Sequence, residues 1–190
     1  MDNYWIETRS GVQFNLSDPR ADDIYINDIA HGLSLLCRYV GQCRQFYSVA
    51  EHSILCSKMA EDEGLPVSVQ LACLLHDAAE AYLGDLSGPL KALLRDSGAD
   101  LLDLLESAMM SVVLEGLGLE GKCRFTSDVE RIDKAMLAVE VGCLMESRGQ
   151  WLPSDWPQAG LTCRVIGYPQ ESVEAMFLGR YVDLARRVGA

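Results

Sequence analysis

The sequence LACLLHDAAEAYLGDLSGPLK (residues 71–91) decides the fold, because its first half has the pattern of a buried helix. Residues 71–83 are mostly apolar, favour helix formation and include neither Gly nor Pro, which predicts a helix over this range. Gly84 stands where a glycine at the C′ position would end it. We therefore expect a buried central helix with the other helices packed around it.

Three polar groups, His76, Asp77 and Glu80, interrupt this apolar stretch. A buried carboxylate destabilises a fold by several kcal/mol unless it is paired or binds a metal. His76 and Glu80 are four residues apart and share a helix face, and Asp77 lies about 100° around the helix from His76. The alternative is a histidine at a helix end beside solvent-facing acids. The surrounding Leu and Ala residues leave little room for such a solvated face, so the pattern favours a metal site.

Length and composition predict one globular domain. The chain has 190 residues, of which 49% are hydrophobic and 23% charged, a composition typical of a folded domain with a substantial core. No apolar run approaches the ~18 residues that a membrane span requires. The N-terminus, MDNYWIETRSG, lacks the basic and apolar segments of a signal peptide. We therefore expect a cytoplasmic protein.

Charge and cysteine usage exclude several classes of protein. Sixteen basic and twenty-eight acidic residues give a net charge of −12, which repels nucleic-acid polymers and anionic membranes. The seven cysteines, which include Cys163, are scattered and form no C-x-x-C pair. This pattern argues against a zinc ribbon or a disulfide framework, and it favours a reducing compartment.

The order of local patterns predicts a mainly α protein with a small N-terminal β-hairpin. Alternation over residues 11–16 and the short apolar run 24–26 predict a hairpin within about residues 11–27. The helical core should cover about residues 28–148, and a last amphipathic helix about 171–188. Within the core, Asn27 or Asp28 is expected to cap a helix that ends at Gly41, and Ser127 with Glu130 forms a possible capping box. The remaining expected helices cover residues 49–63, a segment around 93–94, 101–114 and 127–146.

His52 and Asp133 are the further candidate ligands. His52 lies early in the helix that precedes the central one, and helices joined by a short turn pack antiparallel. His52 and His76 should therefore lie at the same end of that helix pair. Asp133 lies more than one turn inside a later helix, flanked by Ile132 and an apolar run, where no helix cap can use its charge. Its competitor, Asp128, lies in the first turn of that helix, where the helix dipole alone explains an acid.

These residues resemble the H…HD…D signature of the HD-domain metal-dependent phosphohydrolases. The resemblance extends to YSVAEHS (residues 47–53) and HDAAEAYLGDLSGPLK (residues 76–91), and it covers roughly residues 29–146. Within that superfamily the motifs resemble those of bacterial 5′-deoxynucleotidases and phage dATP triphosphohydrolases, which implies the cytoplasm of a bacterial or phage-infected cell. The resemblance implies a single HD-domain helical bundle that hydrolyses small deoxynucleotides.

The resemblance also implies a role for each site residue. His52, His76, Asp77 and Asp133 would hold one or more divalent ions, such as Co, Mn, Mg, Zn or Fe. Glu80 and Asp85 would assist catalysis. Arg38 would contact phosphate, Tyr39 would lie by the nucleoside where relatives usually carry Trp or Phe, and Lys91 would add a mobile positive charge.

Several alternatives stay open at this stage. Arg38 could instead be a cation beside the C-terminal carbonyl groups of a helix, and His31 is expected to be a buried structural histidine rather than a substrate contact. The chain could also be a catalytically weak HD module that binds a nucleotide or metal as a regulator. Monophosphatase and triphosphohydrolase activities use the same ligands. The long apolar helices and the resemblance together predict a homo-oligomer.

Overall fold

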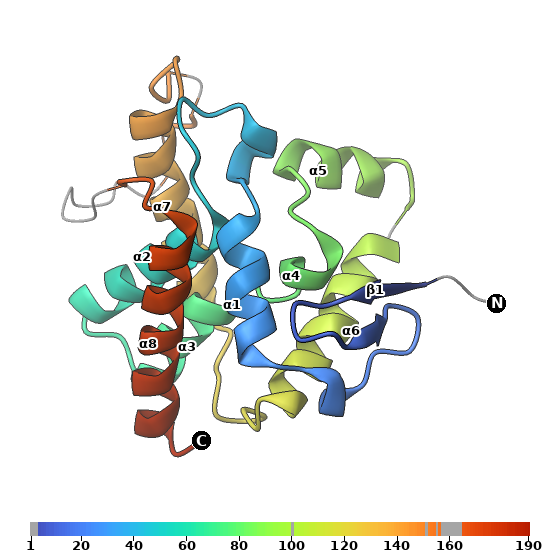
Figure 1. The fold of residues 1–190 in the computed structure, drawn as a ribbon. Helices are drawn as coiled ribbons and strands as arrows, with labels where there is room; N and C mark the ends of the chain where they lie inside the picture. Colours follow the sequence, from blue (N-terminus) through green and yellow to red (C-terminus); the bar gives the residue numbers. More distant parts are fainter. Residues whose placement is uncertain (1–3, 100, 151, 155, 157–164) are drawn as a thin grey trace.

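The chain is mainly helical, with one small antiparallel hairpin near its N-terminus, as the sequence predicts (Figure 1). This computed structural model describes residues 4–99, 101–150, 152–154, 156 and 165–190, so Cys163 lies outside the described residues. The strands are β1 (Trp5–Glu7) and β2 (Gln13–Asn15). The helices are α1 (Ile26–Leu35), α2 (Val49–Asp62), α3 (Val67–Leu75), α4 (Glu80–Leu83), α5 (Gly88–Asp96), α6 (Leu101–Gly116), α7 (Ser127–Leu144) and α8 (Gln170–Val188), with short 3-10 helices η1 (Ala21–Asp23) and η2 (Arg38–Gly41).

The hairpin pairs a different segment from the one predicted. β2 lies within the expected first strand, but its partner is β1, with Ile6 opposite Phe14. Residues 24–26 do not form a strand, because Ile24 packs against the end of α6 and the chain then enters α1 directly. A Cβ atom added at Gly116 would lie only 2.6 Å from the Ile24 Cβ, so this close approach requires a glycine. The prediction for residues 24–26 was wrong because tertiary packing outweighed a short apolar pattern.

The predicted central helix is divided into two pieces. α3 ends at Leu75, residues 76–79 form a turn, and α4 begins at Glu80. The amides of residues 78 and 80–82 bond to carbonyls three residues back, which tightens the chain at this point. Gly84 ends α4 with a φ of 84°, as its position predicts. The polar residues therefore lie in and beside a turn, whereas the sequence predicted an unbroken helix.

The segment before α2 also differs from its prediction. α1 begins at Ile26 and is not capped by Asn27 or Asp28, and it ends at Leu35 rather than continuing to Gly41. Tyr39 and Val40 then adopt left-handed conformations, with φ values of 60° and 54°. A non-glycine residue in this region is destabilised by about 1–2 kcal/mol, and such strain is concentrated at functional sites. The η2 turn is thus a strained connection between α1 and α2.

The core is formed by α1, α2, α3 and α7, and α8 covers it. α2 packs most extensively on α3, and α8 lies against α1, α2 and α3 (Figure 1). Two polar contacts fasten the C-terminal segment to α2. The buried Glu51 carboxylate accepts hydrogen bonds from the amides of residues 166–168 at 2.9–3.0 Å, and Arg180 of α8 donates to Ser57 and Glu61.

The N-cap of α7 lies one residue earlier than the sequence predicts. Thr126 is the N-cap residue, and its side chain accepts a hydrogen bond from the Asp128 amide at 3.3 Å. Ser127 is therefore the first residue of the helix and not its cap. Asp128 remains in the first turn, with its side chain 44% exposed, as the sequence predicts.

α5 and the first half of α6 bear an exposed leucine surface. Its most exposed members are Leu93, Leu101 and Leu104, each about two-thirds exposed. Self-association stays a prediction, and this surface is where it would be tested. Among the described helices, none is both long enough and apolar enough to cross a membrane.

Candidate metal centre

The four predicted ligands come together at one end of the α2–α3 pair. His52 and His76 approach with their Nε2 atoms 3.2 Å apart, which confirms the predicted antiparallel packing. Asp133 Oδ1 on α7 lies 3.1 Å from His52 Nε2 and 3.9 Å from His76 Nε2. Asp77 Oδ2 lies 3.3 Å from His76 Nε2 and 3.7 Å from His52 Nε2. Two imidazoles and two carboxylates thus converge from three separate segments.

The second nitrogen of each imidazole is held by an acceptor. His52 Nδ1 donates to Glu140 Oε1 at 2.6 Å, and His76 Nδ1 donates to the Cys73 carbonyl at 2.8 Å. With the Nδ1 protons held there, the Nε2 atoms of both imidazoles face the centre of the cluster, where a bound ion would take the place of their protons. Metal-binding histidines show the same arrangement, in which an outer acceptor fixes the tautomer and the ring orientation.

Glu140 is a fully buried carboxylate with several donors around it. The hydroxyl groups of Tyr39 and Tyr47 donate to it at 2.6 and 2.7 Å, and Arg38 Nε lies 3.3 Å from Oε2. Burial alone would raise the pKa of Glu140, but Arg38 and His52 outweigh burial and lower it to about 2. Glu140 is therefore ionised at neutral pH and can hold His52 in place.

Cys56 joins the cluster and was missed by the sequence analysis. Its sulfur lies 3.5 Å from His52 Nε2, and the ligand atoms of His52, Cys56, His76 and Asp133 all lie within 4.8 Å of one another. The available signal was its spacing, four residues after His52 on the same helix face. Burial raises the pKa of the Cys56 thiol to about 11, so it is a neutral, weak ligand at neutral pH.

The charges in the cluster are suited to a cation. Without an ion, both imidazoles carry a proton on Nε2: burial alone would raise the pKa of Asp133, but the hydrogen bonds that these Nε2 groups donate outweigh burial and hold that pKa well below its usual value. The Asp133 side chain is 40% exposed, more than its apolar flanks predicted. Asp133 therefore stays ionised and accessible, and a set of two nitrogen and two oxygen donors suits a first-row divalent ion. The His52, Cys56, His76 and Asp133 group could hold a metal ion.

A cavity of about 380 Å³ adjoins the cluster. His76, Asp77 and Glu80 line one side, and residues of α5 and α6 line the other, among them Lys91 and Glu106. Lys91 Nζ lies 3.3 Å from Glu80 Oε1 and 2.9 Å from Glu106 Oε1. The cavity therefore has an ion-paired lysine opposite the metal ligands.

Glu80 is the buried acid of this cavity. Its Oε2 atom has no hydrogen-bond partner within the described part of the chain. Burial, followed by the charges of Asp77 and Asp85, raises the pKa of Glu80 to about 8. A buried carboxylate with one free oxygen and such a pKa is typical of a group that exchanges a proton in a reaction.

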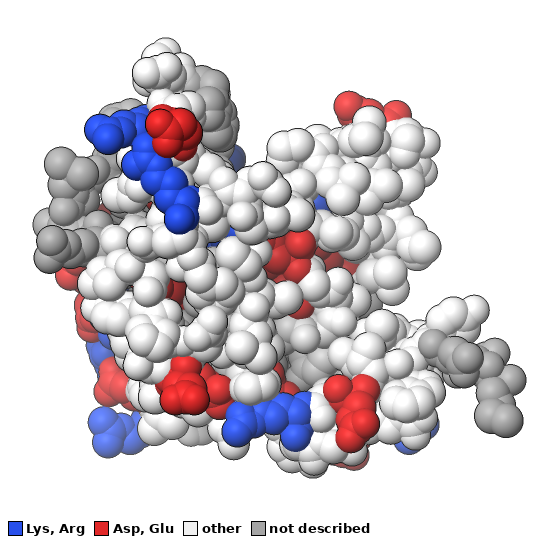
Figure 2. Space-filling model, turned by 45° about the horizontal axis from the view of Figure 1, so that its top comes forward, with Lys and Arg blue, Asp and Glu red and all other residues white. Residues whose placement is uncertain are grey.

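The remaining predicted site residues lie around the same centre. Arg38 Nη1 lies 3.5 Å from Asp77 Oδ2, so Arg38 contacts site carboxylates from the η2 turn and is not a cation at the end of α1. Tyr39 is bonded to Glu140, and nothing tests its predicted place beside a nucleoside. Asp85 is partly buried, and burial, opposed by Arg38, raises its pKa. Acidic side chains gather in a recess near the centre of the face shown in Figure 2.

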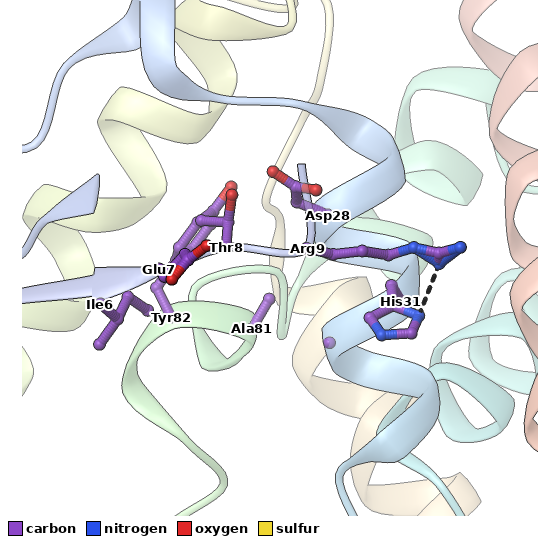
Figure 3. A pocket seen from close by; sticks show the side chains of 9 residues that line it. Ile6, Glu7, Thr8, Arg9, Asp28, His31, Ala81 and Tyr82 are labelled. Atoms are coloured by element: carbon purple, nitrogen blue, oxygen red, sulfur yellow. Dashed lines mark hydrogen bonds between the residues drawn. The ribbon is translucent and has the colours of Figure 1, made fainter. Parts of the chain in front are cut away.

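His31 lies at a second cavity, of about 440 Å³, between the hairpin, α1 and α4 (Figure 3). Its Nδ1 atom is 2.9 Å from Glu174 Oε2 and 3.1 Å from Arg9 Nη1, and its side chain is 31% exposed. The expected hydrogen bonding is present, but the histidine is only partly buried. Asp28 accepts from the amide and hydroxyl of Ser10 at the same cavity.

Comparison with known proteins places the chain beside two bacterial proteins. It is 35% identical over 182 residues to the uncharacterized protein YfdR of Escherichia coli, which covers 95% of this chain and 96% of that protein. It is 41% identical over 113 residues to the uncharacterized protein RCAP_rcc00048 of Rhodobacter capsulatus, which covers 57% of this chain and 58% of that protein. No protein-family model matches the chain.

Proposed function

The chain belongs to the family of the Escherichia coli protein YfdR, and we propose that it is a metal-dependent phosphohydrolase of the HD type. The observation that carries this proposal is the convergence of His52, His76, Asp77 and Asp133 beside the buried carboxylate of Glu80, whose Oε2 atom has no hydrogen-bond partner within the described residues. Its substrates are small (deoxy)nucleotides, hydrolysed by a dATP or dNTP triphosphohydrolase or a 5′-deoxynucleotidase reaction. The resemblance of residues 29–146 to the HD phosphohydrolases supports this choice.

His52, His76, Asp77 and Asp133 are the residues that would hold the ion. Asp77 is preferred to Cys56 as the fourth ligand, because Asp77 lines the cavity and offers a carboxylate oxygen, whereas Cys56 is buried and its thiol is neutral. When bound, a divalent ion would supply a Lewis acid that polarises a phosphoryl oxygen and makes a nearby water more acidic.

The protein's own residues then provide proton transfer and positive charge. Glu80 accepts the proton of the attacking water through its unpaired Oε2, and a cation nearby lowers the pKa of Glu80 from about 8 towards neutrality. Asp85 orients that water or protonates the leaving oxygen. Lys91 and Arg38 offset the negative charge of the phosphate, Arg38 through a planar fork of donors.

The surroundings favour a small anionic substrate over a polymer. A cavity of about 380 Å³ lies in the size range of small-molecule sites. The chain carries a net charge of −12, so Arg38 and Lys91 act as a local positive charge on a protein that repels nucleic acid. Local attraction of this kind suits a single nucleotide that enters the cavity.

The test is a screen of metal-stripped protein with nucleoside mono- and triphosphates, after addition of Mn, Co, Mg, Zn or Fe ions in turn. We expect turnover only with added metal, and the product distinguishes the two reactions, since a triphosphohydrolase releases triphosphate and a nucleotidase releases phosphate. Unchanged turnover in excess EDTA, with metal analysis showing an empty site, would contradict the proposal. Metal binding without turnover of any nucleotide would favour the regulatory module.

A further inference from the structure

Two cysteines stand at either end of the strained η2 turn. Cys37 immediately precedes η2 and Cys43 follows it, and their sulfur atoms lie 4.0 Å apart. Both side chains are partly exposed. Between them the turn carries Arg38, which contacts Asp77 and Glu140, and Tyr39, which donates to Glu140.

We propose that Cys37 and Cys43 are a reversible oxidation site, a thiol pair that closes into a disulfide and locks the η2 turn. The ligand class is a small oxidant such as hydrogen peroxide. The modification acts on the segment that holds Arg38 and Tyr39 against the metal centre, and it leaves the metal ligands themselves untouched.

The geometry allows the bond to form with a local movement. A disulfide requires the sulfurs to approach from 4.0 Å to about 2.05 Å. Rotation of one side chain between staggered rotamers moves a cysteine sulfur by up to about 3 Å, which is more than the gap to be closed. Cys37 is fixed by a β-bridge to Ser48, so Cys43 is the side that moves, giving up its 3.0 Å contact with the Gln45 carbonyl.

The oxidation balances with one peroxide. The first sulfur attacks a peroxide oxygen, the O–O bond breaks, and a sulfenic acid and one water result, the water taking up the thiol proton. The second sulfur attacks the sulfenic sulfur, the S–O bond breaks and a second water leaves. Two thiols and one peroxide thus give one disulfide and two waters, and two electrons pass from sulfur to oxygen. Burial and the neighbouring Cys37 raise the pKa of Cys43, so the reaction quickens as pH rises.

The closed ring would add a covalent restraint to a turn that side-chain contacts and a few backbone hydrogen bonds hold, among them the Gln42 amide to the Tyr39 carbonyl at 2.9 Å. Tyr39 and Val40 are in strained left-handed conformations, and their geometry is maintained by the contacts of Arg38 and Tyr39 with Asp77 and Glu140. A covalent link around so short a loop removes much of the conformational freedom of its open state. Oxidation should therefore keep Arg38 docked beside the metal centre.

Other cysteines differ in their surroundings. Cys56, Cys73 and Cys123 are buried, and burial raises the pKa of each thiol, which suppresses their oxidation. Cys143 is exposed on α7 and provides a control for reactivity that depends on exposure alone.

The experiment compares reduced and peroxide-treated full-length protein, with metal content measured in both. Non-reducing peptide mapping should find a link between Cys37 and Cys43, reversed by dithiothreitol, and absent from Cys37→Ser and Cys43→Ser. Hydrogen exchange of the amides of residues 38–42 should slow by roughly tenfold or more in the oxidised protein. The Cys143→Ser variant should behave as wild type in both measurements.

Absence of the link in peroxide-treated protein overturns the proposal, and so does a link that leaves amide exchange at residues 38–42 unchanged. A loss of metal on formation of the link also overturns it, since the ligands should be unaffected. Neither readout uses turnover, so failure here is separable from failure of the proposed phosphohydrolase activity.

Discussion

Two buried glutamates flank the metal cluster in opposite electrostatic states. Glu140 is surrounded by donors from His52, Tyr39 and Tyr47, with Arg38 beside it, and its pKa is lowered to about 2. Glu80 has one oxygen near Lys91 and another without a partner within the described part of the chain, and its pKa is raised to about 8.

The difference in pKa between the two glutamates indicates two different roles, one in positioning a ligand and one in proton transfer. Both residues are buried glutamates, so residue type and burial do not distinguish them. The number of hydrogen-bond donors does distinguish them. A carboxylate with donors at both oxygens is held as an anion, whereas a carboxylate with one free oxygen keeps a lone pair available and has a pKa near neutral pH. We infer that Glu140 positions His52 and that Glu80 takes part in proton transfer.

The largest effect is expected from a substitution that removes a ligand of the ion between the two glutamates. Asp133→Asn should weaken metal binding by orders of magnitude and abolish turnover, because Asp133 Oδ1 is the carboxylate atom closest to His52 Nε2. Asp128→Asn is the matched control on the same helix. It should keep one ion per chain and destabilise the fold by at most about 1 kcal/mol. Full metal in Asp133→Asn with an empty site in Asp128→Asn would reverse the assignment.

Exchange of each glutamate for glutamine tests the comparison directly. Glu80→Gln should keep the metal but lose roughly 10²-fold or more in kcat, the usual scale for a general base. Glu140→Gln should instead weaken metal affinity by about 10- to 100-fold, because His52 Nδ1 loses its anionic partner. Metal titration and steady-state kinetics on both variants decide the matter. A Glu80→Gln kcat within about threefold of wild type would remove Glu80 from proton transfer.

Arg38 contacts the carboxylates of Asp77 and Glu140. Its substitution should have a smaller effect than the glutamate substitutions, and the effect should be on substrate binding. Arg38→Ala should raise KM by several-fold, and more for nucleoside triphosphates than for monophosphates, since a longer phosphate chain carries more charge. Arg44→Ala is the control, because Arg44 pairs with the exposed Glu146. Steady-state KM values across phosphate lengths provide the measurement, and KM values unchanged from wild type at every length would argue against phosphate contact.

The smallest effect is a dependence of stability on pH. In metal-free protein the pKa of Glu80 is raised from 4.5 to about 8, so the folded state keeps a proton that the unfolded state has released. The free energy of unfolding should therefore fall as pH rises from about 4.5 to 8, and Glu80→Gln should remove that loss. Glu140 acts in the opposite sense, since its stabilisation is lost as pH falls from 4.5 towards 2.

Urea unfolding of wild type and Glu80→Gln at pH 5 and pH 8 measures this term. The advantage of the variant should be larger at pH 8, by on the order of 1 kcal/mol. An advantage that is the same at both pH values would show that the proton of Glu80 is not retained on folding.

Spacing along single helices predicted much of the site. The positions of His52 and His76 in adjacent helices required them to meet, and the depth of Asp133 in its helix distinguished it from Asp128. Helix periodicity is a local property, so such inferences survive even where helix ends shift. The division of the central helix at His76 did not disturb them.

The features that were missed depend on contacts between distant segments. β2 pairs with β1 and not with residues 24–26, because Ile24 packs on α6. A short stretch of sequence around Ile24 contains no information about that contact. The strained η2 turn is maintained by Glu140, about a hundred residues later in the chain. Cys56 had a usable signal in its spacing from His52, but a cysteine in a helix is more often a packing residue.

The position of α8 in the chain has a consequence for protein synthesis. Translation proceeds from the N-terminus, so every residue of the metal cluster leaves the ribosome before residues 170–188 do. Until then, the faces of α1, α2 and α3 that α8 covers are without Val173, Phe177 and Leu184, and Glu51 lacks the amides of residues 166–168. The histidines and aspartates of the cluster are thus synthesised while the core is still open on one side, and α8 covers that side last.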